Sequence, residues 1–347
     1  MTEINIEGIT GQSTILVGES WEALSARIVP GRTVIISDEN VQRLYGNHFP
    51  DCPVILIGQG EEHKTLETVQ GLYRKLLGLG LDRSGMIVGI GGGIVCDVAG
   101  YVAATYLRGV RFGSLATTLL AQVDASVGGK TGVNCDGFKN MVGIFRQPEF
   151  VICDLTTLAS LPPRELSCGF AEIVKHGAIA DADYFTFLER HTDLALTLDP
   201  PVMTHVVTRS VEIKAAVVRA DETEQGLRRH LNFGHTLGHA YEKTTPFNHG
   251  EAVSAGMASA ARLSVAQGLL PEADRQRLTA LLRAYGLPLA PAAADSRQVL
   301  EALAKDKKKE GDQIHFVLLE AIGRAVVRPL PLAELNAFFS ASPNRHS

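Results

Sequence analysis

The sequence contains few cysteines, few aromatic residues and no excess of positive charge. Its 347 residues include five cysteines and one tryptophan, and aromatic residues make up 6% of the chain. An odd number of cysteines without close spacing argues against a disulfide framework and is typical of buried thiols in a reduced cytosol. The net charge of −5 and the pI of about 6.1 provide no electrostatic basis for binding nucleic acid.

Long apolar segments are also missing. No stretch of about 18 uncharged apolar residues occurs, so we expect no membrane-spanning segment. Residues 1–5 lack the basic region and apolar run of a signal peptide, and we therefore predict a cytoplasmic protein. Hydrophobic residues make up 45% of the chain, which allows a large core, and the length suggests about two domains of roughly 150 residues each.

The first part of the sequence alternates short β-branched runs with helical segments. Three runs, 33–37, 54–57 and 86–90, are predicted to be buried strands, and helix-like stretches such as 68–79 follow them. Strands that alternate with helices in this way form parallel sheets that are covered on both faces. We therefore predict a Rossmann-like α/β domain over residues 1–161.

From about Pro162 the sequence is dominated by alanine, leucine, arginine and glutamate. Helical periodicity predicts helices over 164–196, 201–219 and 251–285. A hairpin of two strands, 314–318 and 324–327, is predicted across a turn at 321–323. We therefore predict a second, mostly α-helical domain over residues 162–347. Leu161-Pro162-Pro163 is the expected boundary between the two domains.

Three glycines, 91–93, follow the third predicted strand and precede a helix expected to begin near Ile94. Glycines there let the backbone approach a phosphate, and a helix N-terminus adds a favourable dipole; a plain tight turn is the alternative. The usual dinucleotide fingerprint is incomplete, because Cys96 stands where its last glycine would be. Asp38 ends an earlier strand, where it could accept hydrogen bonds from a ribose or cap the next helix.

Histidines in the second half suggest a metal site. His235 and His239 are four residues apart and share a face if they lie on one helix, and His249 follows beyond Pro246. A carboxylate with two or three imidazoles is the ligand set of an open, catalytic zinc site. The spacing is not His-Glu-x-x-His, because Thr236 stands where that motif has its glutamate. From these residues alone, a metal site and a simple pair of surface or core histidines both remain open.

Cationic residues could bind an anionic substrate. Lys130 follows two glycines, which suits an anion held by backbone N–H groups. Lys175 comes three residues after Glu172, so the two side chains share a helical face. Either they form a simple ion pair, or Glu172 binds a metal while Lys175 binds the substrate beside it. The lysine-rich run 305–309 would normally face solvent, although it could lend a lysine to a phosphate. A polar stripe on one helix is expected from Arg228, Asn232, His235 and His239.

Together these segments resemble the 3-dehydroquinate synthase family of sugar-phosphate cyclases, over roughly residues 30 to 330. The segments that carry the resemblance are 91–97, 104–109, 117–134, 139–140, 171–175, 221–226, 231–239 and 249–253. The chain departs from the family at Phe138, which stands where a glycine is usual before Lys139-Asn140. A changed substrate preference would show in that loop.

The resemblance implies an N-terminal Rossmann-like dinucleotide-binding domain and a helical C-terminal domain that binds metal and substrate. It implies a metal, zinc with cobalt as the alternative, held by Glu172, His235 and His249, with His239 near the substrate instead. The implied NAD contacts are Asp38, Glu61, Lys64, Gly92, Gly93, Asp97, Thr117, Thr118, Lys130 and Lys139. The implied substrate contacts are Asp124, Lys130, Lys139, Asn140, Lys175, Lys214, Arg228, Asn232, His239 and Lys307. Arg108 is expected to reach the substrate phosphate of the other subunit in a homodimer.

The family's reaction belongs to the shikimate pathway of aromatic amino acid biosynthesis. It converts 3-deoxy-arabino-heptulosonate 7-phosphate into 3-dehydroquinate and phosphate. The ring carbon that bears a metal-polarised hydroxyl gives a hydride to NAD⁺ while the hydroxyl loses its proton, and the resulting ketone acidifies the neighbouring C–H so that phosphate leaves by elimination. NADH then returns the hydride, the ring opens and an aldol reaction closes the carbocycle.

Three alternatives to this function stay open. The first is a related cyclase that acts on sedoheptulose 7-phosphate or an amino analogue. The second is a polyol dehydrogenase of the glycerol dehydrogenase type, and the third is a nucleotide-binding regulator without activity. Arg228 and Asn232 favour an acid substrate, because a neutral ketose needs no partner for a carboxylate.

Overall fold

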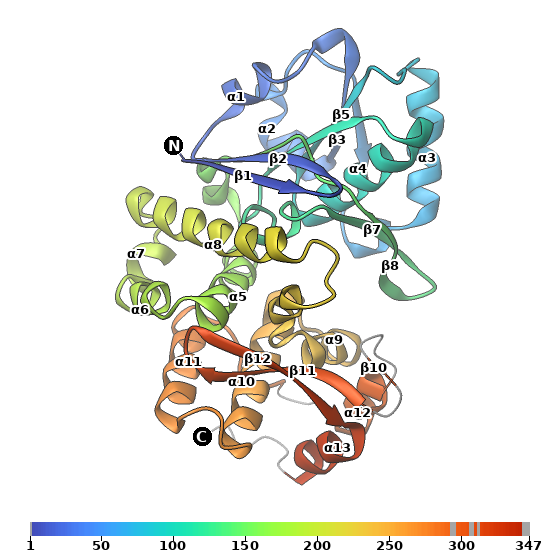
Figure 1. Cartoon of the computed structure of the whole chain (residues 1–347). Helices are drawn as coiled ribbons and strands as arrows, with labels where there is room; N and C mark the ends of the chain where they lie inside the picture. The colour runs from blue at the N-terminus through green and yellow to red at the C-terminus, as the bar shows by residue number, and fades with distance from the viewer. Residues whose placement is uncertain (1, 292–295, 305–308, 311–312, 342–347) are drawn as a thin grey trace. The chain divides into compact units, whose positions relative to one another are not determined.

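The computed structural model describes residues 2–291, 296–304, 309–310 and 313–341, and it contains two compact units (Figure 1). The first unit comprises Met1–Pro162 with Met203–Thr223, and the second comprises Pro163–Val202 with Glu224–Ser347. The units differ from the predicted domains 1–161 and 162–347 because Met203–Thr223 returns to the first unit. Contacts of Lys214 and Glu222, described below, hold that segment there.

A seven-stranded sheet forms the centre of the first unit. Its order is β1 (Thr2–Gly8), β2 (Gly11–Val17), β9 (Phe150–Cys153), β6 (Arg111–Ala116), β5 (Met86–Gly91), β3 (Thr33–Asp38) and β4 (Val54–Ile57). Neighbouring strands are parallel except β1 and β2, which pair antiparallel. All residues of β5 and β9 are buried, as expected for strands covered on both faces. The predicted strands are β3, β4 and β5, so the Rossmann-like parallel sheet is confirmed.

Helices of the first unit pack on this sheet through small and apolar side chains. They are α1 (Trp21–Ser25), α2 (Glu39–Tyr45), α3 (Leu66–Gly78) and α4 (Gly93–Thr105); most of α8 (Pro200–Ala220) also belongs to the first unit. α3 buries Val69, Leu72 and Leu76, which share one helical face. A Cβ at Gly89 of β5 would lie 2.9 Å from the Cβ of Ala99, so glycine is what lets α4 approach the sheet.

A separate two-stranded sheet, β7 (Lys130–Cys135) with β8 (Phe138–Phe145), was not predicted. β8 is mostly exposed on both faces, so it lacks the alternation of apolar and polar residues that identifies a half-buried strand. Within the described part of the chain, no helix combines the length and apolar character that a membrane crossing requires.

The second unit is mostly helical. It contains α5 (Pro163–Ala180), α6 (Ala182–Arg190), α7 (Thr192–Leu196), α9 (His235–Thr244), α10 (His249–Ala266), α11 (Glu272–Ala284), α12 (Ser296–Ala304) and α13 (Leu332–Ala341). Three strands complete it: β10 (Lys309–Glu310), β11 (Gln313–Ala321) and β12 (Arg324–Pro331). The predicted hairpin is β11–β12, drawn in red and orange in Figure 1, and the predicted helix 201–219 is α8.

Two predicted helical tracts are shorter in the structure than in the sequence pattern. The tract 164–196 is divided into α5, α6 and α7, because the side chain of Asp181 accepts a hydrogen bond from the backbone of Tyr184 and starts a new helix. The tract 251–285 is divided into α10 and α11 by Gly268, which takes a φ of 69°, and by Pro271. Apolar periodicity continues across these breaks because adjacent helices bury faces against the same core.

The predicted polar stripe of Arg228, Asn232, His235 and His239 does not lie on one helix. A 3₁₀ helix covers Leu227–Asn232, Gly234 takes a φ of 80°, and α9 begins at His235. A Cβ at Gly234 would lie 2.5 Å from Cγ of Met257, so this turn packs directly against α10. The left-handed glycine interrupts the helix, so the helical spacing of these four residues in the sequence does not place them on one helical face.

Candidate functional site

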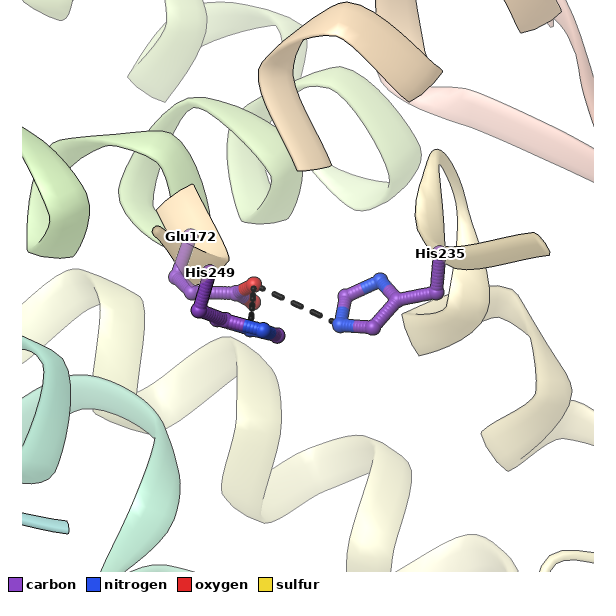
Figure 2. Close-up of side chains that lie close together, drawn as sticks. All are labelled: Glu172, His235 and His249. Atoms are coloured by element: carbon purple, nitrogen blue, oxygen red, sulfur yellow. Dashed lines mark ion pairs between the residues drawn. The ribbon is translucent and has the colours of Figure 1, made fainter. Parts of the chain in front are cut away.

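Three side chains from three helices of the second unit meet at one point. Glu172 lies in α5, and His235 and His249 are the first residues of α9 and α10. Nε2 of His235 lies 3.5 Å, and Nε2 of His249 3.3 Å, from Oε1 of Glu172 (Figure 2). One donor atom from each residue lies within 4.8 Å of the other two, so the structure brings together the three residues predicted as metal ligands.

Capping and close packing fix the start of α10, and with it His249. The side chain of Asn248 accepts a hydrogen bond from the backbone of Glu251, whose carboxylate accepts one from the backbone of Asn248. A Cβ at Gly250 would lie 2.4 Å from Cα of Cys168, so α10 begins in direct contact with α5. Cys168 is one helical turn before Glu172, and this contact therefore sets the separation of Glu172 and His249.

Glycines let the backbones of α9 and α10 come into direct contact. A Cβ at Gly256 would lie 1.9 Å from the backbone oxygen of Gly234, and a Cβ at Gly238 would lie 3.2 Å from that of Ala252. A larger residue at either position would push the helices apart. The packing places His235 and His249 beside each other, with ring centroids 5.3 Å apart.

Glu172 is fully buried and needs positive partners. Burial would raise the pKa of Glu172, but Lys175 and the two histidines lower it well below its usual range. Lys175 donates a hydrogen bond to Oε2 of Glu172, so the ion pair considered from the sequence is present. Oε1, which faces the histidines, has no hydrogen-bond partner among the described residues. The ion pair therefore leaves one carboxylate oxygen available to a metal.

The donor set fits a divalent metal such as zinc. Burial would lower the pKa of His249, but the nearby carboxylates of Glu172 and Glu242 raise it to about 10. A metal binding here would replace that proton at Nε2. One carboxylate and two imidazoles are three protein ligands, which leaves a coordination position for substrate or water, as catalytic zinc sites do.

His239 lies beside the three residues but outside their cluster. Its ring meets that of His235 edge to face, with centroids 5.5 Å apart. Among the described residues, His249 rather than His239 joins Glu172 and His235 within ligand distance. The geometry thus favours the ligand set implied by the family resemblance over the helical pair considered from the sequence.

The other predicted substrate contacts of the second unit lie near the start of α9. Arg228 is 2% exposed, in the 3₁₀ helix that precedes Gly234. Asn232 donates a hydrogen bond to the carboxylate of Glu224, a residue that takes a φ of 64°. The sequence prediction missed Glu224, although it lies inside the motif segment 221–226. Lys307 lies outside the described residues.

In the first unit, residues predicted to contact NAD lie at one edge of the sheet. Asp38 ends β3, Gly92 and Gly93 follow β5, and Thr117 and Thr118 follow β6. Strands β3, β5 and β6 are parallel neighbours, so these residues meet at their carboxyl ends, where α/β folds bind nucleotides.

The glycine turn at this edge leaves little room for side chains. A Cβ at Gly92 would lie 3.1 Å from Cγ2 of Thr118, and a Cβ at Gly93 3.0 Å from the Cβ of Ala125. α4 begins at Gly93, so the backbone N–H groups of its first turn lie at this edge of the sheet. Asp38 accepts a hydrogen bond from the backbone of Val41 at 2.9 Å, and it therefore also caps α2.

A buried lysine links three of the predicted residues. Lys64 is 4% exposed and donates to Asp97 at 2.5 Å and to Asn140 at 2.6 Å. Burial raises the pKa of Asp97, although Lys64 opposes this effect. Nearby, Glu61 accepts a hydrogen bond from the side chain of Asn134 at 2.8 Å. The sequence did not predict that Lys64 and Asn140 would share this contact.

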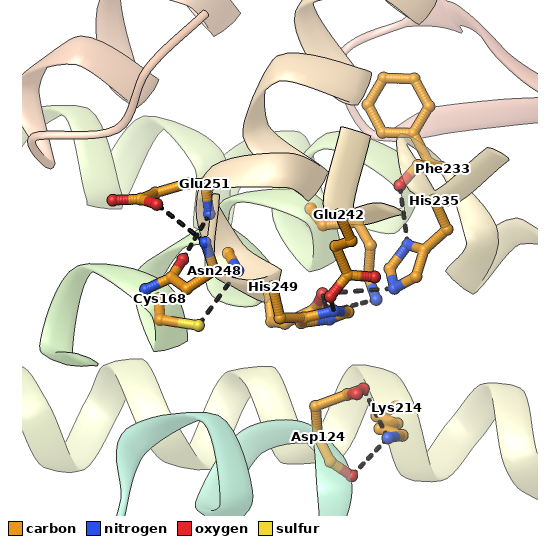
Figure 3. A network of polar contacts seen from close by, with 12 residues as sticks. Asp124, Cys168, Lys214, Phe233, His235, Glu242, Asn248, His249 and Glu251 are labelled. Carbon is orange, nitrogen blue, oxygen red and sulfur yellow. Dashed lines mark hydrogen bonds and ion pairs between the residues drawn. The ribbon is translucent and has the colours of Figure 1, made fainter. Parts of the chain in front are cut away.

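The remaining predicted residues of the first unit are a partly buried ion pair and three exposed cations. Lys214 of α8 lies 2.5 Å from Oδ1 of Asp124 (Figure 3). Arg108, Lys130 and Lys139 are exposed. Arg108 follows Leu107, and both take left-handed backbone conformations, with φ of 67° and 51°. Two such residues in succession are strained, and strain of this kind is typical of functional segments.

Comparison with known proteins agrees with this geometry. The family described as 3-dehydroquinate synthase N-terminal matches residues 54–168, and 3-dehydroquinate synthase C-terminal matches residues 169–309. A 3-dehydroquinate synthase of Halorhodospira halophila is 46% identical over 311 residues, which cover 88% of each chain.

Two solved structures of other sugar-phosphate cyclases share the fold. A 2-epi-5-epi-valiolone synthase of Streptomyces hygroscopicus with bound NAD⁺ and Zn²⁺ has a TM-score of 0.86 at 28% identity, covering 98% of this chain and 97% of its own. A 2-deoxy-scyllo-inosose synthase with carbaglucose-6-phosphate, NAD⁺ and Co²⁺ has a TM-score of 0.85 at 28% identity, covering 97% and 98%. The sequence identity to the curated relative and the two matching family regions place this chain in the 3-dehydroquinate synthase family.

Proposed function

We propose that this chain converts 3-deoxy-arabino-heptulosonate 7-phosphate into 3-dehydroquinate and phosphate, with NAD and a divalent metal as cofactors. The observation that carries this proposal is the meeting of Glu172, His235 and His249, with Lys175 on the second oxygen of Glu172. The 46% identity to a 3-dehydroquinate synthase supports the same reaction.

The metal would be held by Glu172, His235 and His249. When bound, it supplies a Lewis acid that lowers the pKa of a substrate hydroxyl. Lys175 remains bonded to Oε2 of Glu172, and its positive charge keeps that carboxylate ionised at neutral pH. His239 provides an imidazole beside the ligands, and imidazole is the side chain that most often serves as a general acid or base.

NAD would lie at the carboxyl edge of β3, β5 and β6, where it supplies a reversible hydride acceptor. Gly92 and Gly93 let the backbone of the α4 N-terminus approach the pyrophosphate. Asp38 has two carboxylate oxygens, and the one that caps α2 leaves the other for a ribose hydroxyl.

Arg228 favours an acid substrate over a neutral sugar. A guanidinium can hold a carboxylate through two parallel hydrogen bonds, and a buried one does so away from water. The solved neighbours are cyclases named for other products, so a reaction on sedoheptulose 7-phosphate is the second candidate. The buried Arg228 is the observation that favours the heptulosonate phosphate.

We further propose that the active protein is a cytoplasmic homodimer in which Arg108 serves the site of the other subunit. Arg108 is exposed and sits on a strained turn, which suits a contact with a second chain. The five cysteines are free thiols, as in proteins of a reducing compartment.

One assay tests the main proposal. Purified protein with NAD, zinc and the heptulosonate phosphate should release phosphate without accumulating NADH, because the hydride is returned in each turnover. Accumulation of NADH with a simple polyol, and no phosphate release, would indicate a dehydrogenase instead. Phosphate release from sedoheptulose 7-phosphate alone would identify the alternative cyclase.

A further inference from the structure

A buried carboxylate lies behind one of the proposed metal ligands. Glu242 lies on α9, seven residues after His235, and its side chain is 4% exposed. Its Oε1 lies 3.3 Å from Nδ1 of His249 (Figure 3). The other ring nitrogen, Nε2, faces Glu172, so His249 is held between two carboxylates, one at each ring nitrogen.

The Glu242 contact determines which nitrogen of His249 carries a lone pair. An ionised carboxylate can only accept hydrogen bonds, so an ionised Glu242 makes Nδ1 of His249 the donor in this contact. In the neutral ring the lone pair then lies on Nε2, the atom that faces Oε1 of Glu172. Metal-binding histidines are commonly oriented in this way by a carboxylate or a carbonyl group.

The two proposed histidine ligands differ in their second contact. Nδ1 of His235 lies 3.3 Å from the backbone oxygen of Phe233, which is a neutral group. Hydrogen bonds to an ionised partner are roughly twice as strong as those between neutral groups. His249 should therefore be the more firmly oriented of the two imidazoles.

We propose that Glu242 is a positioning residue that holds His249 in the tautomer and ring orientation required to bind the metal. The proposal rests on the metal site proposed above. One helix serves both histidines: α9 supplies His235 directly and, two turns later on the same face, supplies Glu242 to His249. The glycine contacts of Gly238 and Gly256 keep α9 close enough to α10 for this.

The test measures metal affinity rather than turnover. Cobalt and zinc dissociation constants would be determined for metal-free full-length protein by competition with a chromogenic chelator. Glu242→Gln should weaken both metals by about 10–100-fold, the usual effect of losing such a partner. Glu242→Asp should fall between this variant and the wild type. The visible spectrum of the cobalt form should also change in Glu242→Gln, because the geometry of the His249 ligand is altered.

A matched control removes the same charge elsewhere in the same unit. Glu272 of α11 pairs with Arg275 and is half exposed, so Glu272→Gln should bind cobalt as the wild type does. Wild-type cobalt affinity and spectrum in Glu242→Gln would overturn the proposal. So would an equal loss of affinity in Glu272→Gln. If Glu242→Gln fails to fold, as judged by circular dichroism of the metal-free protein, Glu242→Asp and the same control decide the question.

A further variant separates this proposal from the metal site itself. His249→Ala should bind cobalt much more weakly than the wild type. If His249→Ala and wild type bind cobalt equally, the proposed metal site is wrong, and the role of Glu242 falls with it. If His249→Ala loses affinity while both Glu242 variants keep it, only the role of Glu242 is wrong.

Discussion

Lys175 donates its hydrogen bond to one oxygen of Glu172 and leaves the other oxygen facing two histidines. The carboxylate is fully buried, so without Lys175 its charge would be expensive to maintain. With Lys175, Glu172 stays ionised, and Oε1 is directed at the point where His235 and His249 meet. The sequence alone leaves an ion pair with Lys175 and a metal ligand as alternative roles for Glu172. In the structure one carboxylate oxygen makes the ion pair, and the other is placed for the proposed metal.

The histidines should differ in their effect on metal content. We expect His249→Ala and His235→Ala to lose zinc on dialysis, because each removes one of three ligands. His239→Ala should keep zinc and lose catalytic rate, by about 10²–10⁴-fold if it transfers a proton. Elemental analysis with a parallel activity assay measures both, and His230→Ala serves as a control on a nearby histidine. Retention of zinc by His249→Ala together with its loss in His239→Ala would reverse the assignment.

The protein should prefer NAD to NADP because of Asp38. Its carboxylate would repel a 2′-phosphate and accept a hydrogen bond from a free ribose hydroxyl. Asp38 also caps α2, so Asp38→Asn is the informative variant, since asparagine caps helices equally well. We expect an unchanged melting temperature and a preference for NAD narrowed about tenfold, or roughly 1.4 kcal/mol. Titration calorimetry measures both cofactors, and equal wild-type affinities would contradict the prediction.

Arg108 and Lys130 should complement each other across a dimer. Arg108→Ala and Lys130→Ala should each be nearly inactive, because every site in either homodimer lacks one cation. A mixed dimer of the two variants would contain one intact site if Arg108 serves the other subunit. Co-expression with two affinity tags isolates the heterodimers, which should recover up to about half of the wild-type activity per dimer. Failure of verified heterodimers to recover activity would place Arg108 in its own subunit's site.

Arg228 should determine the preference for an acid substrate. If it pairs with the substrate carboxylate, a sugar that lacks this group loses a buried charge-assisted contact, which costs on the order of 2–5 kcal/mol. Sedoheptulose 7-phosphate should therefore have a much lower kcat/KM than the heptulosonate phosphate. Arg228→Ala should narrow the gap mainly by weakening the acid substrate, whereas Arg229→Ala should leave it unchanged. Equal efficiency of the wild type on both sugars would refute the assignment.

Glu222 should stabilise the first unit in a pH-dependent way. Its carboxylate, 8% exposed, accepts hydrogen bonds from the backbone of Ile9 and Thr10 and from Gln147. Burial would raise the pKa of Glu222, but these donors lower it below its usual 4.5. The stabilisation is therefore present above about pH 4.5 and is lost as the pH falls through the lower pKa of the folded state.

Replacing Glu222 tests this sign directly. Glu222→Gln should reduce the free energy of unfolding at pH 7 by about 1–3 kcal/mol, because an amide NH₂ would face N–H donors. The difference from wild type should shrink as the pH falls below 4.5. Urea unfolding at several pH values measures it, and Glu149→Gln, which breaks an exposed pair with Arg111, should change stability by less than about 1 kcal/mol. A difference that grows on acidification would show that the pKa shift has the opposite sign.

Local patterns in the sequence determined the strands β3, β4 and β5, the glycine turn after β5, the helix α8 and the hairpin β11–β12. These features depend on side-chain period and turn chemistry within a few residues, which a single sequence displays. The family resemblance added the candidate ligands. It did so through whole motifs, because the spacing of Glu172, His235 and His249 in the chain carries no geometric information.

Only the tertiary structure decided which side chains share a site. His235 and His239 lie one turn apart on α9, yet His249 joins Glu172, because glycine contacts at Gly234, Gly238 and Gly256 bring α10 against α9. The left-handed Gly234 removes Arg228 and Asn232 from the helix of His235. Glu242 was not identified from the sequence because its partner, His249, lies on another helix. Contacts between helices depend on close packing of their backbones, and the apolar periodicity of each helix does not predict which helix it packs against.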